Sequence, residues 1–228
     1  MHGAVLQITA LPPGLRRFTL ADLPRERWRN GAGWTRTVAS ADNAKPHDPP
    51  DWRVSLAELK QGAPFSLFPG MDRTAVLVRG GPVLLRGVPS EDDALRHWPL
   101  STPGDLACFA GEWPMDNAPP AHEALVWNVM ARRGQVRAEV QVLCGTAWGG
   151  EDGQDRAMPP PDHTLLWVLQ GGFHALTPAG QTLFTLDADE GLHAQGHAAR
   201  PGALRLLPDT PEATLVCTRL WSGPGRAP

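Results

Sequence analysis

Short apolar segments separated by clusters of glycine and proline run through the whole sequence. The chain has 228 residues, including 24 Gly and 24 Pro. Short apolar runs bounded by turn residues are typical of strands, and long amphipathic helical patterns are scarce. The sequence therefore predicts an all-β protein, with one helical turn in 20–30 that Asp22 would cap. The expected strands are 34–39, 52–59, 74–79, 83–87, 106–109, 123–130, 135–143, 165–170, 173–177, 182–186, 202–207 and 213–220.

An internal repeat indicates that one β unit occurs twice. The segment TAVLVRGGPVLLR (74–86) resembles TLLWVLQGGFHAL (164–176), and Pro-Gly pairs follow at 103 and 201 in the same order. Each Gly-Gly pair is expected to form a tight hairpin, because such turns need the positive φ angles that glycine adopts readily. The alternative is that Gly pairs recur by chance in a Gly-rich chain.

The charge balance argues against several classes of partner. The formal net charge is -3, so no general attraction to nucleic acid or to an anionic membrane is expected. The sequence shows neither a signal peptide nor an apolar run of bilayer-spanning length, and a cytoplasmic location is predicted. The only lysines are Lys45 and Lys60. A carboxylate bound by this protein is therefore expected to be held by arginine, whose planar fork contacts both oxygens.

The sequence can be compared with the positions at which one family of β-barrels carries its metal ligands. A strand ending in V-L-x-G, followed by a later Gly-Asp and Pro-x-Gly segment, resembles cupin barrels. Metal-binding cupins carry two His and one Glu before that glycine. By this spacing the positions fall on Ser66, Phe68 and Arg73 in the first half, and on Ala157, Pro159 and Thr164 in the second. His193 and His197 lie in a segment expected to be a loop without a third ligand. No metal and no other cofactor are therefore predicted.

Four segments in order resemble the HutD/Ves family: WRNGAGWTRTVA (28–39), WRVSLAEL (52–59), GAPFSLFPGMDRTAVLVRGG (62–81) and WNVMARRG (127–134). The resemblance implies an all-β bicupin, with two packed cupin-like β-barrels (RmlC-like jelly rolls) and strand exchange. An N-terminal barrel with the pocket is expected in 1–120 and a C-terminal barrel in 121–228. Exposed strand edges and duplicated barrels are also compatible with a homodimer.

The resemblance also implies a function. These bacterial proteins occur beside histidine-utilisation genes or as stand-alone stress-associated proteins, and they are not an established enzyme family. The implied role is regulatory binding of a small acidic metabolite such as urocanate, formylglutamate or a formate-like anion. Three positions depart from the family pattern: Ala32 replaces a Gly, Thr37 a Glu, and Val126 the Asp of a D-x-N motif. The loss of two acidic groups implies a different ligand preference.

The candidate ligand-binding residues combine polar groups with apolar walls. Alternation along strands places Arg53 with Ser55, and Asn128 with Met130 and Arg132, on single faces. Arg73 stands where metal-binding cupins carry a metal ligand, and there it would hold a carboxylate. The alternative is that Arg73 forms a structural salt bridge. Asn30 followed by glycine is equally compatible with a simple turn. The full set is Trp28, Asn30, Arg53, Ser55, Phe65, Ser66, Phe68, Arg73, Phe109, Asn128, Met130 and Arg132.

Catalytic motifs are missing from the sequence. There is no nucleophile elbow, no phosphate loop and no Tyr, so no catalytic residue is predicted. Asp72, Glu58 and Glu112 remain as carboxylates for acid–base chemistry, without an evident partner. Three functions stay open: a metal-free carboxylate-binding regulator, a cofactor-free isomerase or hydrolase using Asp72 or Glu58, and an interaction protein whose Trp residues line an interface.

Overall fold

A computed structural model describes residues 11–28, 31–41, 49–89, 94–145, 159–200 and 203–223. Apart from one 3-10 turn, η1 (Gly196–Ala199), every regular element in these ranges is a β-strand, which confirms the all-β prediction. The chain divides into an N-terminal unit, Leu23–Arg137 with Ser222–Pro228, and a C-terminal unit, Met1–Asp22 with Ala138–Trp221. In the described part of the chain, no helix has the length and apolar character needed to cross a membrane.

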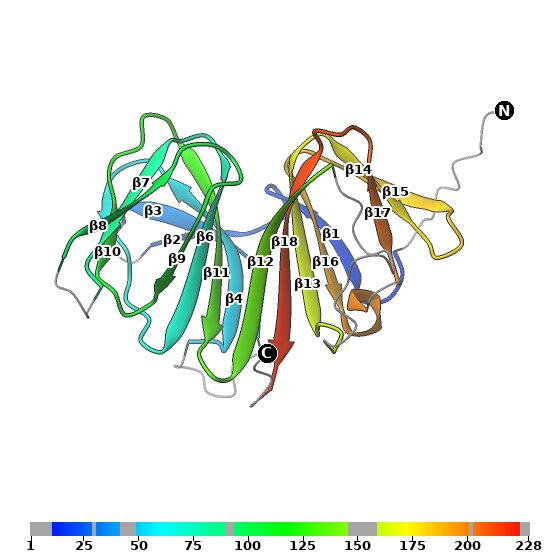
Figure 1. Ribbon diagram of the computed structural model, residues 1–228, viewed down its shortest axis with the longest axis horizontal. Helices are drawn as coiled ribbons and strands as arrows, with labels where there is room; N and C mark the ends of the chain where they lie inside the picture. The colour runs from blue at the N-terminus through cyan, green and yellow to red at the C-terminus, as the bar shows by residue number, and fades with distance from the viewer. Residues whose placement is uncertain are drawn as a thin grey trace. The chain divides into compact units, whose positions relative to one another are not determined.

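Two antiparallel sheets form the N-terminal unit (Figure 1). The larger sheet contains, in spatial order, β2 (Arg25–Arg27), β3 (Gly33–Ser40), β4 (Trp52–Leu59), β11 (Ala124–Arg132), β6 (Met71–Arg79) and β9 (Leu106–Ala110). The smaller contains β5 (Ala63–Pro64), β10 (Met115–Asn117), β7 (Val83–Gly87) and β8 (Arg96–Leu100). Buried side chains from both sheets, such as Leu77 and Leu85, share one core. Among the described residues no strand pairing joins the two sheets into a closed barrel.

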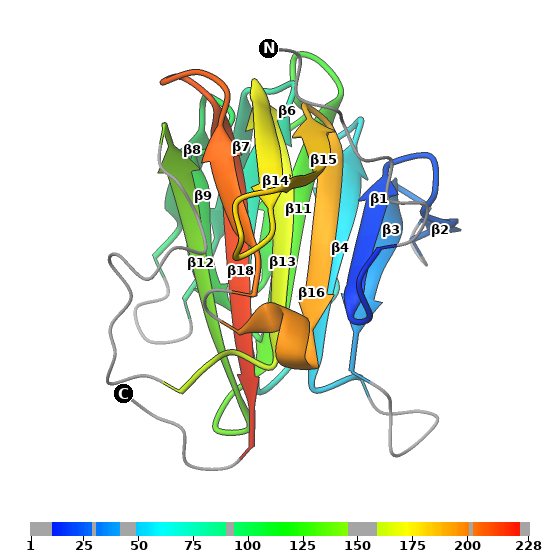
Figure 2. The same cartoon turned by 90° about the vertical axis from the view of Figure 1, so that its right-hand side faces the viewer.

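The C-terminal unit repeats this plan with fewer strands (Figure 2). Its larger sheet contains β1 (Leu15–Thr19), β16 (Glu190–Gln195), β13 (His163–Gln170), β18 (Thr214–Ser222) and β12 (Val136–Cys144). Its smaller sheet contains β15 (Thr182–Asp187), β14 (Gly172–Leu176) and β17 (Arg205–Pro208). The order β12-β18-β13-β16 matches β4-β11-β6-β9, and β17-β14-β15 matches β10-β7-β8. This shared order supports the predicted duplication.

The division of the chain differs from the expected boundary after residue 120. Strand β11 pairs with both β4 and β6 and therefore forms the centre of the N-terminal sheet. Strand β1, from the start of the chain, pairs with β16 of the C-terminal unit. A cut at residue 120 would remove a strand with two partners from one sheet. The observed boundaries cut strands only at their ends, after the second residue of β12 and before the last residue of β18.

The two Gly-Gly pairs do not form hairpins, contrary to the sequence prediction. β6 and β7 belong to different sheets, as do β13 and β14, so each pair turns the chain from one sheet to the other. Positive φ angles occur at Gly80 (73°), Gly81 (92°) and Gly171 (70°), and a Cβ on Gly80 would collide with the carbonyl oxygen of Glu123. The Pro-Gly repeat was also misleading, because Pro103 precedes β9 whereas Pro201 precedes β17, which corresponds to β10.

Six observed strands were not predicted from the sequence: β1, β2, β5, β8, β10 and β16. The expected helical turn is replaced by β2, and Asp22 accepts a hydrogen bond from the backbone N–H of Thr19 (2.8 Å) across a short turn. The expected loop around His193 is β16. A glycine weakens an isolated strand, but the ring of Phe18 occupies the position that a side chain on Gly191 would fill. Packing from β1 therefore supports this strand.

Candidate functional site

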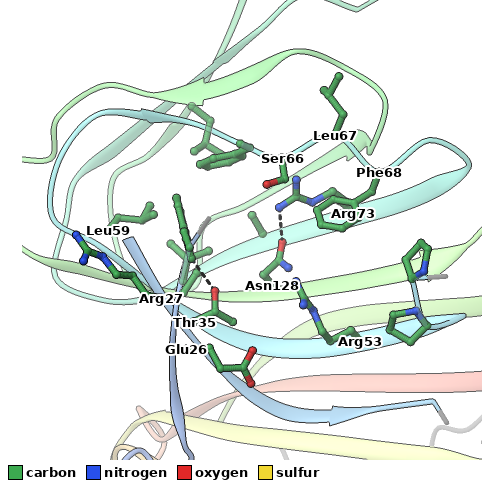
Figure 3. A pocket seen from close by; sticks show the side chains of 18 of the residues that line it. Glu26, Arg27, Thr35, Arg53, Leu59, Ser66, Leu67, Phe68, Arg73 and Asn128 are labelled. Carbon is green, nitrogen blue, oxygen red and sulfur yellow. Dashed lines mark hydrogen bonds between the residues drawn. The ribbon is translucent and has the colours of Figure 1, made fainter. Parts of the chain in front are cut away.

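A cavity of about 720 Å³ lies in the N-terminal unit (Figure 3). Its wall includes residues of the larger sheet, Leu85 of the smaller sheet, and the loop 65–70 that follows β5. This loop is held in place by backbone hydrogen bonds from Phe65 to Met115 (2.8 Å) and from Phe68 to Gly111 (2.8 Å). The predicted site residues Trp28, Arg53, Phe65, Ser66, Phe68, Arg73 and Asn128 line the cavity.

Strand pairing explains why the polar side chains meet. Met130 on β11 pairs with Arg53 on β4 and with Arg73 on β6. Directly paired residues project to the same face of a sheet, so both guanidinium groups reach the cavity at one level. Asn128, two residues earlier on β11, projects to the same face and is paired with Ser55. The alternation predicted from the sequence therefore describes this part of the wall.

Arg73 is held by one hydrogen bond and by aromatic rings. Its Nη2 donates to Oδ1 of Asn128 (3.0 Å), and its Cζ lies 5.4, 5.7 and 5.0 Å from the ring centroids of Phe65, Phe68 and Phe109. Its buried Nε has no hydrogen-bond partner among the described residues. Burial and the charge of Arg53 lower the pKa of Arg73 to about 10. The group is charged at neutral pH but poorly solvated.

Arg53, like Arg73, has a buried Nε and lies beside an aromatic ring. Its Nη2 contacts the sulfur of Met130 (3.7 Å), its Cζ lies 5.9 Å from the centroid of Phe68, and its buried Nε is unpartnered by described residues. Burial lowers the pKa of Arg53, and the charge of Glu26 opposes this shift. Within the described ranges, neither Arg53 nor Arg73 forms an ion pair. Two adjacent guanidinium groups with no ion-pair partner in these ranges suit an anion.

The side chains present do not fit a metal. Ser66, Phe68 and Arg73 occupy the region where the cupin spacing would place metal ligands, and a guanidinium is a cationic donor without a lone pair to offer. Among the described residues, no three His, Cys, Asp or Glu side chains gather closely enough to hold a metal ion.

Several predicted site residues lie outside the cavity wall. Phe109 and Met130 are buried against Arg73 and Arg53, and Ser55 is buried with its Oγ unpartnered by described residues. Arg132 does not line the cavity: its Nε donates to Asp51 (2.6 Å) and its Nη2 to the carbonyl of Pro49 (2.8 Å). Asn30 lies outside the described residues.

Sequence reasoning missed Glu26 and Val126 as cavity residues. Val126 lies two residues before Asn128 on β11, so the alternation used for Asn128 would have found it. Glu26 lies on β2, where a helical turn was expected. Its pairing with Thr35 places it on the cavity face, but no sequence pattern showed that pairing.

The three candidate carboxylates do not line the cavity. Asp72 accepts hydrogen bonds from Nε (3.0 Å) and Nη2 (2.8 Å) of Arg133, and Glu112 accepts from Nη1 of the same arginine (2.9 Å). Glu58 pairs with Arg25 and Arg36. Successive strand residues project to opposite faces, so Asp72 points away from the site that Arg73 faces. The adjacent acid and base are therefore not a functional pair.

Replacing Asp72 with Asn is expected to leave ligand binding within about twofold of wild type. The exposed ion pair with Arg133 contributes less than about 1 kcal/mol to stability, so the unfolding free energy changes little. Calorimetric titration and urea denaturation of Asp72→Asn and Glu58→Gln test this. Loss of ligand binding or turnover in either variant would instead favour the acid–base alternative.

Comparison with known proteins agrees with the sequence resemblance. The family model HutD matches residues 20–213. Protein Ves of Citrobacter koseri is 31% identical over 218 residues, which cover 92% of this chain and 96% of that protein.

Similar solved structures show the same fold. A conserved protein of unknown function from Pseudomonas aeruginosa has a TM-score of 0.71 and 27% identity, covering 91% of this chain and 99% of its own. HutD from Pseudomonas fluorescens has a TM-score of 0.67 and 16% identity, and the match covers 91% of this chain and 98% of that one. Oxalate decarboxylase from Bacillus subtilis has a TM-score of 0.55 and 10% identity, and the match covers 92% of this chain and 78% of that one. The fold is therefore cupin-like. The chain belongs to the HutD/Ves family.

Proposed function

We propose that the protein binds a small carboxylate metabolite in the cavity of its N-terminal unit, without a metal, and acts as a regulator in histidine utilisation or a stress response. The proposal treats the two units as the two modules of a bicupin, of which the first holds the ligand. The observation that carries it is the pair of partly buried guanidinium groups, Arg53 and Arg73, without an ion-pair partner among the described residues.

A carboxylate would supply what these groups lack. Desolvated charge is costly unless it is paired and hydrogen-bonded, and an incoming carboxylate can accept from both arginines. Ser66, at the mouth, and the amide nitrogen of Asn128 offer further donors beside them. The rings of Phe65 and Phe68 limit water access on one side.

Thermal-shift measurements with urocanate, formylglutamate, formate and histidine test the proposal. At a ligand concentration of 100 times Kd, binding stabilises the folded state by about 2.7 kcal/mol, and we expect at least one carboxylate to raise Tm accordingly. The matched control is Arg86→Met, since Arg86 is paired with Asp116 and neither residue lines the cavity. Protein shown to be folded but not stabilised by any of the four would contradict the proposal.

The two alternatives find less support. A cofactor-free isomerase or hydrolase would use Asp72 or Glu58, which are paired with arginines and do not line the cavity. An interaction protein would present its Trp residues, but the large exposed apolar side chains of the described chain are Leu67, Leu84, Leu95 and Leu106.

A further inference from the structure

The cavity of the N-terminal unit has a charged end and an apolar end. Arg53 lies at the charged end, near the start of β4, with Arg73 across from it. Ala57 and Leu59 follow on the same face of β4, about 13 and 20 Å further along the strand at 3.3 Å per residue. Figure 3 shows this separation, with Leu59 on the opposite side of the cavity from Arg53 and Arg73.

The apolar end is built from two sheets. Val126 is paired with Ala57 on the larger sheet, and Leu85 approaches from the smaller one. Leu59, Leu85 and Val126 are only 2%, 1% and 4% exposed, so a ligand atom there would be removed from water. At about 720 Å³, the cavity is far larger than a formate-sized anion needs.

The apolar end does not suit a second carboxylate. Its buried apolar side chains carry no hydrogen-bond donor, so a carboxylate among them would be desolvated without a partner. The charged residues that border the cavity from β2, Glu26 and Arg27, have opposite charges, and the charge of Glu26 also acts on Arg53. They therefore give this end no net positive charge.

We therefore propose that the ligand is a monocarboxylate with an uncharged apolar body, of the alkyl- or aryl-carboxylate class, and not a dicarboxylate. This inference rests on the proposed function. The carboxylate contacts Arg53 and Arg73, and the body lies along β4 and β11 towards Leu59 and Leu85.

Calorimetric competition titrations of the full chain with a matched series test the ligand class. The probes are acetate, butanoate, hexanoate, 3-phenylpropanoate, glutarate and 3-phenylpropanol. Each buried methylene is expected to tighten binding about fourfold, so hexanoate, with four more methylenes, should bind roughly 200-fold more tightly than acetate. Glutarate should bind at least about tenfold more weakly than hexanoate, because its second carboxylate is desolvated among apolar side chains without a hydrogen-bond donor.

Substitutions in the cavity wall test where the apolar body of the ligand lies. Ala57→Leu fills the apolar end, so the ratio of hexanoate to acetate affinity should fall at least about tenfold, whereas Ala138→Leu, on an exposed position of β12, should keep the wild-type ratio. If Ala57→Leu does not fold, Val126→Thr makes the opposite wall polar at similar volume and should also lower the ratio. An unchanged ratio in the folded variant would overturn the inference.

The outcomes separate this inference from the proposed function. If no carboxylate binds, or if 3-phenylpropanol binds as tightly as 3-phenylpropanoate, both fail. If carboxylates bind and Arg73→Met removes their binding, but glutarate equals hexanoate or chain length has no effect, the proposed function stands and only the monocarboxylate inference is wrong.

Discussion

Replacing Arg73 with methionine is expected to weaken carboxylate binding by at least about 30-fold and to raise the stability of the free protein. Truncating one partner of a buried charge pair costs about 2–5 kcal/mol of binding free energy, and 2 kcal/mol corresponds to that factor. Stability should rise because burial and the charge of Arg53 lower the pKa of Arg73 to about 10. The lowered pKa shows that the folded protein disfavours the charged form of this side chain.

The gain in stability is smaller than the pKa shift alone implies. Methionine also loses the hydrogen bond to Asn128 and the contacts with three Phe rings, so we expect a net increase of about 1 kcal/mol. Urea denaturation of the free protein and calorimetric titration with a carboxylate measure the two effects separately.

A structural role for Arg73 makes the opposite prediction. If Arg73 stabilises the fold through a salt bridge, Arg73→Met would lower the unfolding free energy and leave any ligand affinity unchanged. Arg86→Met is the control, because Arg86 does pair with a carboxylate, Asp116, and does not line the cavity. It should lose at most about 1 kcal/mol of stability and keep its ligand affinity.

The polar wall of the cavity was predictable because it depends on a local rule. Residues two apart in a strand share a face, so Arg53 and Asn128 could be assigned once their strands were recognised. Arg132 obeys the same alternation, yet its long side chain turns to Asp51 at the end of β11. Which partner a flexible arginine chooses depends on the neighbouring chain, and the sequence does not show which segment lies there.

Features that depend on distant pairing could not be predicted. The glycines at 80 and 81 were correctly recognised as turn residues with positive φ, but a hairpin and a crossing between sheets need the same glycines. Glu26 was missed because three charged residues in β2 show no alternation, and only pairing with β3 makes them a strand. Strand β16 likewise depends on Phe18, which is more than 170 residues earlier in the chain.

Acidification is expected to destabilise the protein through a pair of histidines in the C-terminal unit. His193 on β16 is 8% exposed, and its Nε2 lies 3.2 Å from Nδ1 of His163 on β13. Burial, followed by the charges of His163 and Arg16, lowers the pKa of His193 to about 4. Burial also lowers the pKa of His163. The two imidazoles come from neighbouring strands, because β13 and β16 are paired.

The sign of the effect follows from where the proton binds. In the unfolded chain His193 has a pKa near 6.5, so between about pH 6.5 and pH 4 the unfolded state binds more protons than the folded state. Stability is therefore fully present above pH 6.5 and falls as the pH decreases towards 4. A depression from 6.5 to about 4 corresponds to a loss of about 3 kcal/mol.

Urea denaturation at pH 7.0, 5.5 and 4.5 measures this loss, and two variants assign it. In His193→Gln the side chain cannot be protonated, so most of the pH dependence in this range should disappear, although the variant is less stable than wild type at pH 7. In His174→Gln, on an exposed position of β14, the slope should match wild type. If His193→Gln keeps the wild-type slope, the acid sensitivity resides in other groups. In His163→Gln the slope should fall as well, because burial also lowers the pKa of His163. If the losses of slope in the two single variants add up to more than the loss in the double variant, the two rings titrate together.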